Sequence, residues 1–254
     1  MLAERIRAMG ALHWIVLFSG IVLAWVALYA MALPSDLRAA GRFYGADFLA
    51  QLCIVTPDAA GAGRLFLMWA IMSAAMMAPT ALPAFATYEE LRQTARGGSF
   101  AALVGGYLAV WLGFSVLAAG AQIALFSAGL LSAFGDSLSP VLSAVLLAVA
   151  GLYQFSALKA ACLSKCRLPM MFFMEHWDEG PLRNGVRLGA VCLGCCWALM
   201  LLAFVGGVMN IAFMGLATVI MVVEKLPDLG RYVTRPLGWL LCAGSVAMLL
   251  SALI

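Results

Sequence analysis

The sequence is short of charge and of the side chains that most enzymes use. Only 11 % of its 254 residues are Asp, Glu, Lys or Arg, and only two are His. In an ordinary soluble protein, about 25 % of the residues are charged. The sequence also contains no phosphate-binding loop, no dinucleotide-binding fingerprint and no Ser-His-Asp set. The low content of charged residues excludes a water-soluble fold. The missing motifs give no support to an enzyme or to nucleotide-driven transport.

Apolar residues stand in place of the missing charges, and they come in long blocks. Hydrophobic residues make up 65 % of the chain, and its mean hydropathy is +1.03. A membrane-spanning helix needs about 20 largely apolar residues. We therefore predict an all-α, single-domain, polytopic membrane helical bundle over residues 1–254. Its seven transmembrane helices are expected at about 11–33, 65–87, 99–126, 137–158, 184–206, 208–224 and 236–254.

The basic residues predict how this bundle is oriented. Short cytoplasmic loops carry most of the Lys and Arg of a membrane protein. Of the 15 basic residues, only Arg38, Arg42 and Arg64 fall on the side opposite the N-terminus. We expect the N-terminus inside and the C-terminus outside, in a bacterial inner membrane. Because topology explains these charges, the net charge of +3 gives no reason to expect nucleic acid as a partner.

The first hydrophobic stretch has a second interpretation, as a cleaved signal peptide. Arg5 and Arg7 precede it, as in a signal peptide. However, its apolar part is about 20 residues long, whereas that of a signal peptide is about 7–15. We expect a retained helix; cleavage would leave six helices in the same orientation.

Three cysteines lie on one face of the fifth predicted helix. Successive helical residues turn by about 100°, so Cys192, Cys195 and Cys196 share a narrow face. Gly185 and Gly189 lie on the same face, and small residues at this spacing let two helix backbones approach closely. We expect the thiols to point into the bundle as a soft-ligand metal site. The alternative is that they only pack as small apolar side chains.

Methionines form a stripe along the second predicted helix. Met68, Met72 and Met76 recur every four residues, with Met77 beside them. Pro79 removes a backbone hydrogen bond, and we expect the freed carbonyl to find a partner on a neighbouring helix. The stripe should reach the depth of the three cysteines, so we assign both to one site. The alternative is that these flexible side chains only fill the core.

The sixth predicted helix adds further candidates. Met214 and the pair Glu224-Lys225 lie within about 100° of arc, and Met209 is expected near the outer mouth. Asn210 either has a functional role or caps the helix after a tight turn at Gly206-Gly207. Glu224 either serves the site or pairs with Lys225 or with another charge on the inside.

A second pair of cysteines follows the fourth predicted helix. Cys162 and Cys166 are four residues apart, so on a continuing helix they share a face. The neighbouring Lys159, Lys165 and Arg167 favour thiolates, although topology explains their positions equally well. Thiolates at the cytoplasmic edge are suited to accept a soft ion such as Cu(I).

These motifs together resemble a bacterial family of uncharacterised, predicted metal-binding integral membrane proteins. The resemblance covers about Met68 to Lys225 and implies a metal site in an inner-membrane protein, with no established activity. It is carried by Met68-Trp69, Met72, Met76-Met77 and Pro79, by Tyr153-Gln154, Lys159, Cys162 and Cys166-Arg167-x-Pro169, and by Cys192-x-x-Cys195-Cys196-Trp197, Met200, Met209-Asn210, Met214 and Glu224-Lys225.

Copper handling is the first of three functions left open by the sequence. Thiolate and thioether ligands favour Cu(I), and zinc is a further candidate for three thiols. The partners would be the lipid bilayer and a copper chaperone or a subunit of a membrane complex. The expected ligands are Cys192, Cys195, Cys196, Met72, Met76 and Met77, with Cys162 and Cys166 at the cytoplasmic end, Met68 and Met209 at the outer end, and Met214 between.

The other two functions make no use of a bound ion. A transmembrane thiol–disulfide relay requires one cysteine pair to move close to another, and the adjacent Cys195 and Cys196 are poorly placed to pair with each other. A structural or assembly subunit requires only packing. His13 and His176 lie outside the cluster, so neither a bis-His haem nor a His-rich zinc site is expected.

Overall fold

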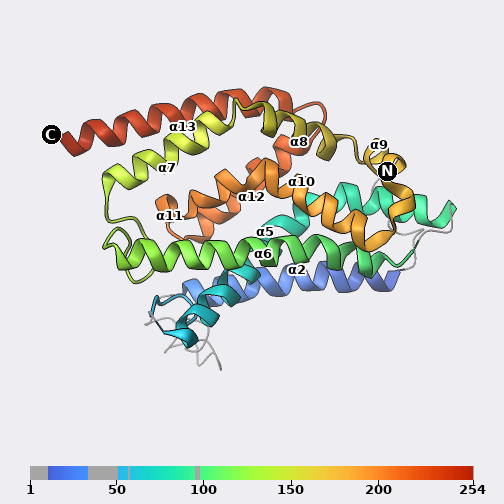
Figure 1. The fold of residues 1–254 in the computed structure, drawn as a ribbon, viewed down its shortest axis with the longest axis horizontal. Coiled ribbons are helices and arrows are strands. Elements are labelled where there is room, and N and C mark those ends of the chain that lie inside the picture. The colour runs from blue at the N-terminus through green and yellow to red at the C-terminus, as the bar shows by residue number, and fades with distance from the viewer. Residues whose placement is uncertain (1–10, 34–50, 57, 95–97, 254) are drawn as a thin grey trace.

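The protein is a bundle of α-helices, as predicted. The computed structural model describes residues 11–33, 51–56, 58–94 and 98–253 (Figure 1), and these contain no β-strand. The long helices are α2 (Ala11–Ala32), α5 (Ala59–Thr94), α6 (Phe100–Ser127), α10 (Pro181–Leu201) and α13 (Gly230–Leu253). The shorter ones are α7 (Pro140–Tyr153), α8 (Ala157–Arg167), α9 (Pro169–His176), the 3₁₀-helix η1 (Trp177–Glu179), α11 (Ala203–Gly206) and α12 (Ile211–Lys225).

Five helical segments among the described residues are long and apolar enough to cross a membrane. They are α2, α5, α6, α10 with its continuation α11, and α13. The pair α7 and α8 makes a sixth if it counts as one span bent by 62°. α12 has 15 residues, which at 1.5 Å per residue gives about 22 Å, short of the roughly 30 Å of a bilayer core. The sequence predicts seven spans; six are found if the bent pair counts as one, and α12 is then the one that is missing.

The fourth predicted helix does not continue through the second pair of cysteines. α7 ends at Tyr153, and Ser156 begins α8 by accepting a hydrogen bond from the Lys159 backbone N–H to its Oγ (3.1 Å). A serine cap satisfies one of the free amide groups at a helix start, so a new helix begins in a different direction. Cys162 and Cys166 share a face of α8 and not of an extended α7.

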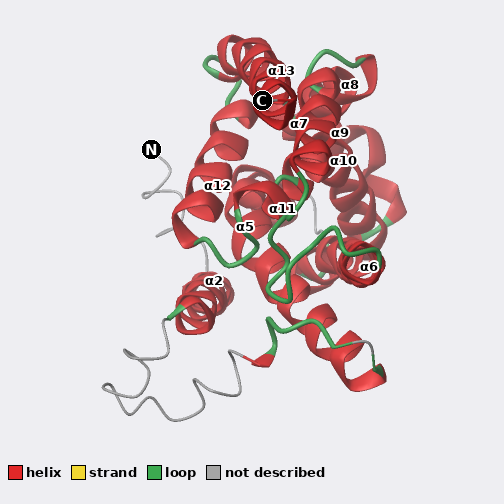
Figure 2. Cartoon of the chain, turned by 90° about the vertical axis from the view of Figure 1, so that its left-hand side faces the viewer, coloured by secondary structure: helices red, strands yellow, loops and turns green. Residues whose placement is uncertain are grey.

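α5 lies at the centre of the bundle, as Figure 2 shows, and packs against α2, α6, α9 and α12. In the apolar stretches of α5 and α10, 61 % of the residues are buried, against 11 % in α2 and 17 % in α13. The methionine stripe and the three cysteines therefore lie on the two most enclosed of these helices.

Small residues bring α10 against α6, as the spacing of Gly185 and Gly189 predicts. A Cβ at Gly185 would overlap the backbone carbonyl oxygen of Leu103, and a Cβ at Gly189 would lie 2.9 Å from that of Tyr107. The backbones therefore approach more closely than any larger side chain allows. This contact turns the cysteine face of α10 toward Tyr107.

The carbonyl freed by Pro79 finds its partner on another helix, as predicted. Proline has no N–H to donate to the residue four positions earlier, which is Ala75. Its carbonyl oxygen accepts a hydrogen bond from Trp25 Nε1 on α2 (3.0 Å). The peripheral helix α2 is thereby tied to the centre of the bundle.

The tight turn before α12 also forms where the two glycines predict it. Gly207 has φ of +93°, a conformation that favours glycine. Asn210 Oδ1 then accepts a hydrogen bond from the Phe213 backbone N–H (3.1 Å). Asn210 is thus a helix cap, which was the simpler of its two interpretations.

Candidate metal site

Three thiols meet in the core of the bundle. The sulfur atoms of Cys192, Cys195 and Cys196 all lie within 4.8 Å of one another. Each of the three residues is at most 2 % exposed, and the sulfurs of Cys195 and Cys196 are 3.2 Å apart. Among the described residues, this is the group of three or more His, Cys, Asp or Glu side chains that could hold a metal ion. The prediction that the thiols point into the bundle is confirmed.

The second pair of cysteines lies against this cluster. Cys166 Sγ is 4.0 Å from Cys195 Sγ. Cys162 is also turned toward α10, since a Cβ built on Gly194 would lie 2.6 Å from its sulfur. The Tyr153 hydroxyl holds the same stretch by donating a hydrogen bond to the Gly194 carbonyl oxygen. The structure thus places Cys166 next to the three-thiol cluster and Cys162 against the same helix, α10, and the role of both as ligands stays a prediction.

Lys225 brings a positive charge to the cluster. Its Nζ donates hydrogen bonds to Cys192 Sγ (2.9 Å) and to Thr80 Oγ1 (2.6 Å). Lys225 is 7 % exposed, and a buried charge without an opposite charge is costly. A thiolate on Cys192 would balance it.

Tyr107 connects the cluster to the backbone of α5. Its hydroxyl donates to the Met77 carbonyl oxygen (2.8 Å) and lies 3.1 Å from Cys192 Sγ. Thr80 Oγ1 donates to the same carbonyl (2.8 Å). The single hydroxyl proton of Tyr107 can therefore turn toward a Cys192 thiolate while Thr80 keeps the Met77 carbonyl satisfied.

Glu224 pairs with Lys159 and not with Lys225. Lys159 Nζ donates to Glu224 Oε2 at 2.9 Å, and both side chains are 1 % exposed. Arg167 Nε donates to the Glu224 backbone carbonyl oxygen (2.9 Å). Because Glu224 is paired with Lys159, the ammonium group of Lys225 interacts with Cys192 and not with Glu224.

A pocket of about 210 Å³ borders the thiols. It is lined in part by Thr80, Tyr107, Cys166, Cys192 and Lys225. An ion that entered this pocket would meet thiol groups from both α8 and α10.

The predicted methionines are spread along the core. Met68, Met72, Met76 and Met77 are all buried on α5, and Met214 is buried on α12. The contact of α5 with Cys192 runs through the Met77 carbonyl and the Thr80 side chain. The assignment of these methionine sulfurs as ligands stays a prediction.

Met209 lies beside a cysteine that the sequence did not single out. Its Sδ is 3.1 Å from the sulfur of Cys53, which is 2 % exposed. The two residues are 156 positions apart, so no spacing rule joins them.

Tyr107 was also not identified from the sequence as a site residue. A hydroxyl group inside an otherwise uncharged hydrophobic stretch is the signal that could have identified it.

The two histidines take no part in the thiol cluster. His13 Nε2 lies 3.6 Å from Glu89 Oε1. His176 Nδ1 lies 2.9 Å from the Phe172 carbonyl oxygen. Within the described chain, the donor set of the cluster is sulfur, which fits a thiophilic ion.

Comparison with known families decides what kind of protein carries this cluster. Residues 66–248, well over half of the chain, match the family PpoB2, described as a copper chaperone. The chain belongs to this family. The matched segment includes the thiol cluster, the methionine stripe and Lys225, and the family description adds a link to copper to the resemblance with metal-binding membrane proteins. No curated protein and no solved structure matches it.

Proposed function

We propose that this protein binds Cu(I) in the membrane through the thiolates of Cys192, Cys195 and Cys196. The observation that carries the proposal is that three buried sulfurs lie within 4.8 Å of one another. Three soft donors with no oxygen or nitrogen ligand among them favour Cu(I) over harder ions. Lys225 offsets part of the negative charge that three thiolates and one monovalent cation leave behind.

Cys166 and Cys162 receive the ion in this proposal. Cys166 is 4.0 Å from Cys195 and lines the pocket beside the cluster. Ligand exchange between sulfurs at this distance moves the ion without releasing it into water. The donor would be a copper chaperone on the cytoplasmic side of a bacterial inner membrane.

Methionines then take the ion toward the other end of the bundle. We assign this role to Met72, Met76 and Met77 on α5 with Met214 on α12, and to Met68 and Met209 nearer the exit. Cys53 joins the exit group through its contact with Met209. The acceptor would be a copper-requiring subunit of a membrane complex.

The experiment is an anaerobic Cu(I) titration of the purified protein against a competing chelator, with each cysteine of the cluster changed to serine in turn. We expect one tightly bound Cu(I), sulfur ligands in its X-ray absorption spectrum, and loss of tight binding in Cys192→Ser, Cys195→Ser and Cys196→Ser. Cys242→Ser is the control, because Cys242 lies on α13 and packs against Gly151 of α7, away from the cluster. Equal affinity in wild type and in the three cluster variants would refute the proposal, and a preference for Zn²⁺ over Cu(I) would refute the choice of metal.

A thiol–disulfide relay is the second candidate, and the contact between Cys166 and Cys195 favours it. The relay requires two cysteines on different elements to come together, and these two sulfurs are already 4.0 Å apart. Thiol trapping in intact cells tests it. A Cys166–Cys195 disulfide under oxidising growth supports the relay, and fully reduced cysteines under all conditions exclude it.

A further inference from the structure

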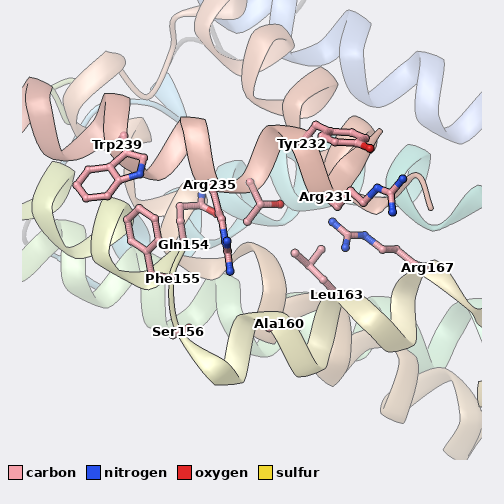
Figure 3. A pocket seen from close by; sticks show the side chains of 11 residues that line it. Gln154, Phe155, Ser156, Ala160, Leu163, Arg167, Arg231, Tyr232, Arg235 and Trp239 are labelled. Carbon is pink, nitrogen blue, oxygen red and sulfur yellow. The ribbon is translucent and has the colours of Figure 1, made fainter. Parts of the chain in front are cut away.

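A second pocket, outside the thiol cluster, lies at the break between α7 and α8. Its volume is about 650 Å³, and the start of α13 forms its other wall. Figure 3 shows Arg235 reaching into it between Trp239 on one side and Arg167 and Arg231 on the other. Three guanidinium groups from two helices therefore line one cavity.

These three arginines have no carboxylate to balance them. Within the described residues, no Asp or Glu oxygen lies within 4.0 Å of a side-chain nitrogen of Arg167, Arg231 or Arg235. One buried guanidinium nitrogen of Arg167, Nη2, has no hydrogen-bond partner. Arg231 instead lies over the ring of Tyr232, at 4.7 Å. The pocket thus presents positive charge with free donors.

Gln154 supplies an independent observation that points to a ligand. It lines the pocket, is 4 % exposed, and neither its Nε2 nor its Oε1 has a partner. A buried amide is almost always hydrogen-bonded. Both atoms of Gln154 are therefore available to bind a group from outside the chain. Nε2 can donate to an anionic oxygen, and Oε1 can accept from a hydroxyl.

Exposed apolar side chains continue from the rim of the pocket. Trp239 is 69 % exposed and its ring centre is 5.2 Å from that of Phe155. Leu152 on α7 and Leu240 on α13 are also exposed, at 66 % and 70 %. Tryptophan is typical of the boundary between headgroups and acyl chains. A molecule with a charged head and apolar tails would contact both regions.

We propose that this pocket binds a phosphate group. Guanidinium groups match phosphate oxygens in charge and in geometry, and basic pockets between helices on the inner side of a membrane are sites for anionic headgroups. The phosphate comes from an anionic phospholipid or from the free anion. The apolar rim favours the lipid, and the unpartnered Gln154 Oε1 suits a headgroup that carries a hydroxyl, such as phosphatidylglycerol.

The test measures binding by native mass spectrometry and by thermal stabilisation of the purified full chain in detergent. The probes are phosphatidylglycerol, phosphatidylcholine and inorganic phosphate, each added separately. The variant is Arg235→Gln, and the control is Arg183→Gln, which removes the same charge from an exposed position outside the pocket. Arg231→Gln replaces the first variant if Arg235→Gln does not fold.

We expect phosphatidylglycerol to bind more tightly than phosphatidylcholine, and Arg235→Gln to weaken it about five- to tenfold, the effect of one arginine at an anionic surface. Arg183→Gln should leave it unchanged. If inorganic phosphate alone stabilises the protein, and only when Arg235 is present, the site stands and its ligand is the free anion. Two results would overturn the proposal. One is an equal loss of phosphatidylglycerol binding in Arg235→Gln and Arg183→Gln. The other is that neither anionic probe, phosphatidylglycerol or inorganic phosphate, binds better than the zwitterionic phosphatidylcholine.

Discussion

At the scale of residues, the two buried lysines Lys159 and Lys225 have different roles because they have different partners. Lys159 is neutralised by Glu224, whereas Lys225 faces Cys192 and Thr80. A lysine next to a carboxylate makes an ion pair, and a lysine next to a thiol favours the form of sulfur that binds metals. Glu224 and Lys225 are neighbours in the sequence, but Glu224 belongs to the ion pair with Lys159 and Lys225 belongs to the thiol cluster.

Replacing Lys225 by leucine should weaken Cu(I) binding while leaving the three thiols in place and adding no soft ligand. A hydrogen bond to a charged group contributes about 1.5–3 kcal/mol, so we expect a loss in affinity of about one to two orders of magnitude. The measurement is the chelator competition described above. Lys165→Leu, at an exposed position of α8, is the matched control and should bind as wild type does. An unchanged affinity in Lys225→Leu would show that its charge does not act on the cluster.

Breaking the pair of Lys159 and Glu224 should destabilise the protein strongly. Lys159→Met leaves the Glu224 carboxylate buried without its partner, which costs about 3–5 kcal/mol. The double variant Lys159→Met/Glu224→Gln removes both charges and should recover most of that loss. Unfolding in denaturant followed by tryptophan fluorescence measures both. If the double variant is no more stable than Lys159→Met, the pair does not account for the loss.

At the scale of elements, contacts made by the backbone position the site. Gly185 and Gly189 let α10 approach α6, and this approach places Tyr107 against Cys192. Pro79 leaves a carbonyl that binds α2 through Trp25. The two glycines act because they lack a Cβ, and Pro79 acts because it lacks a backbone N–H.

Gly185→Ala should separate α6 from α10. The added Cβ would overlap the Leu103 carbonyl oxygen, and overpacking of this kind costs about 1–3 kcal/mol. Gly105→Ala is the control, because a Cβ there meets nothing within 4 Å, and helix propensity then favours alanine by up to about 1 kcal/mol. Thermal unfolding should show a lower midpoint for the first variant and an equal or higher one for the second. The reverse order would contradict the close approach.

The link between Pro79 and Trp25 predicts a specific non-additivity. Trp25→Phe leaves the Ala75 carbonyl without its donor, at a cost of about 1–3 kcal/mol. In the Pro79→Ala background, the new N–H can bond to that carbonyl, so the same Trp25→Phe change should cost less. A double-mutant cycle on unfolding free energies measures the difference. Additive losses would show that the two residues do not share this carbonyl.

At the scale of the whole molecule, α12 decides how many times the chain crosses the membrane. Figure 1 shows that α2 begins and α13 ends at opposite ends of the bundle. Seven crossings require the short α12 to span, with the bent pair of α7 and α8 as one more span. A helix of about 22 Å is long enough only where the bilayer thins or where protein covers its ends.

Fusions to the C-terminus distinguish these arrangements. With the N-terminus inside, seven crossings place Ile254 outside, where fused alkaline phosphatase is active and fused green fluorescent protein is dark. Six crossings, with α12 not spanning, would give the opposite pattern. We expect an active phosphatase, because the basic residues alternate as seven spans require. An inactive phosphatase with a bright fluorescent fusion would remove α12 from the spans.

Local rules in the sequence determined the long helices, the common face of three cysteines, the cap at Asn210 and the turn at Gly206-Gly207. Each depends on residues within a few positions of one another, where helix geometry leaves little choice. Apolar composition likewise determined that the chain is helical, with stretches long and apolar enough to span a membrane.

Only the tertiary structure decided which groups meet across helices. Cys166 lies beside Cys195, Cys53 beside Met209, and Lys159 beside Glu224, at separations of 29, 156 and 65 residues. No periodicity specifies such pairs, because they depend on the angle and depth at which whole helices pack. The 62° bend at Ser156 is the clearest case: Cys166 lies beyond it on α8, beside the thiol cluster, and the arginine-lined pocket lies at the same break.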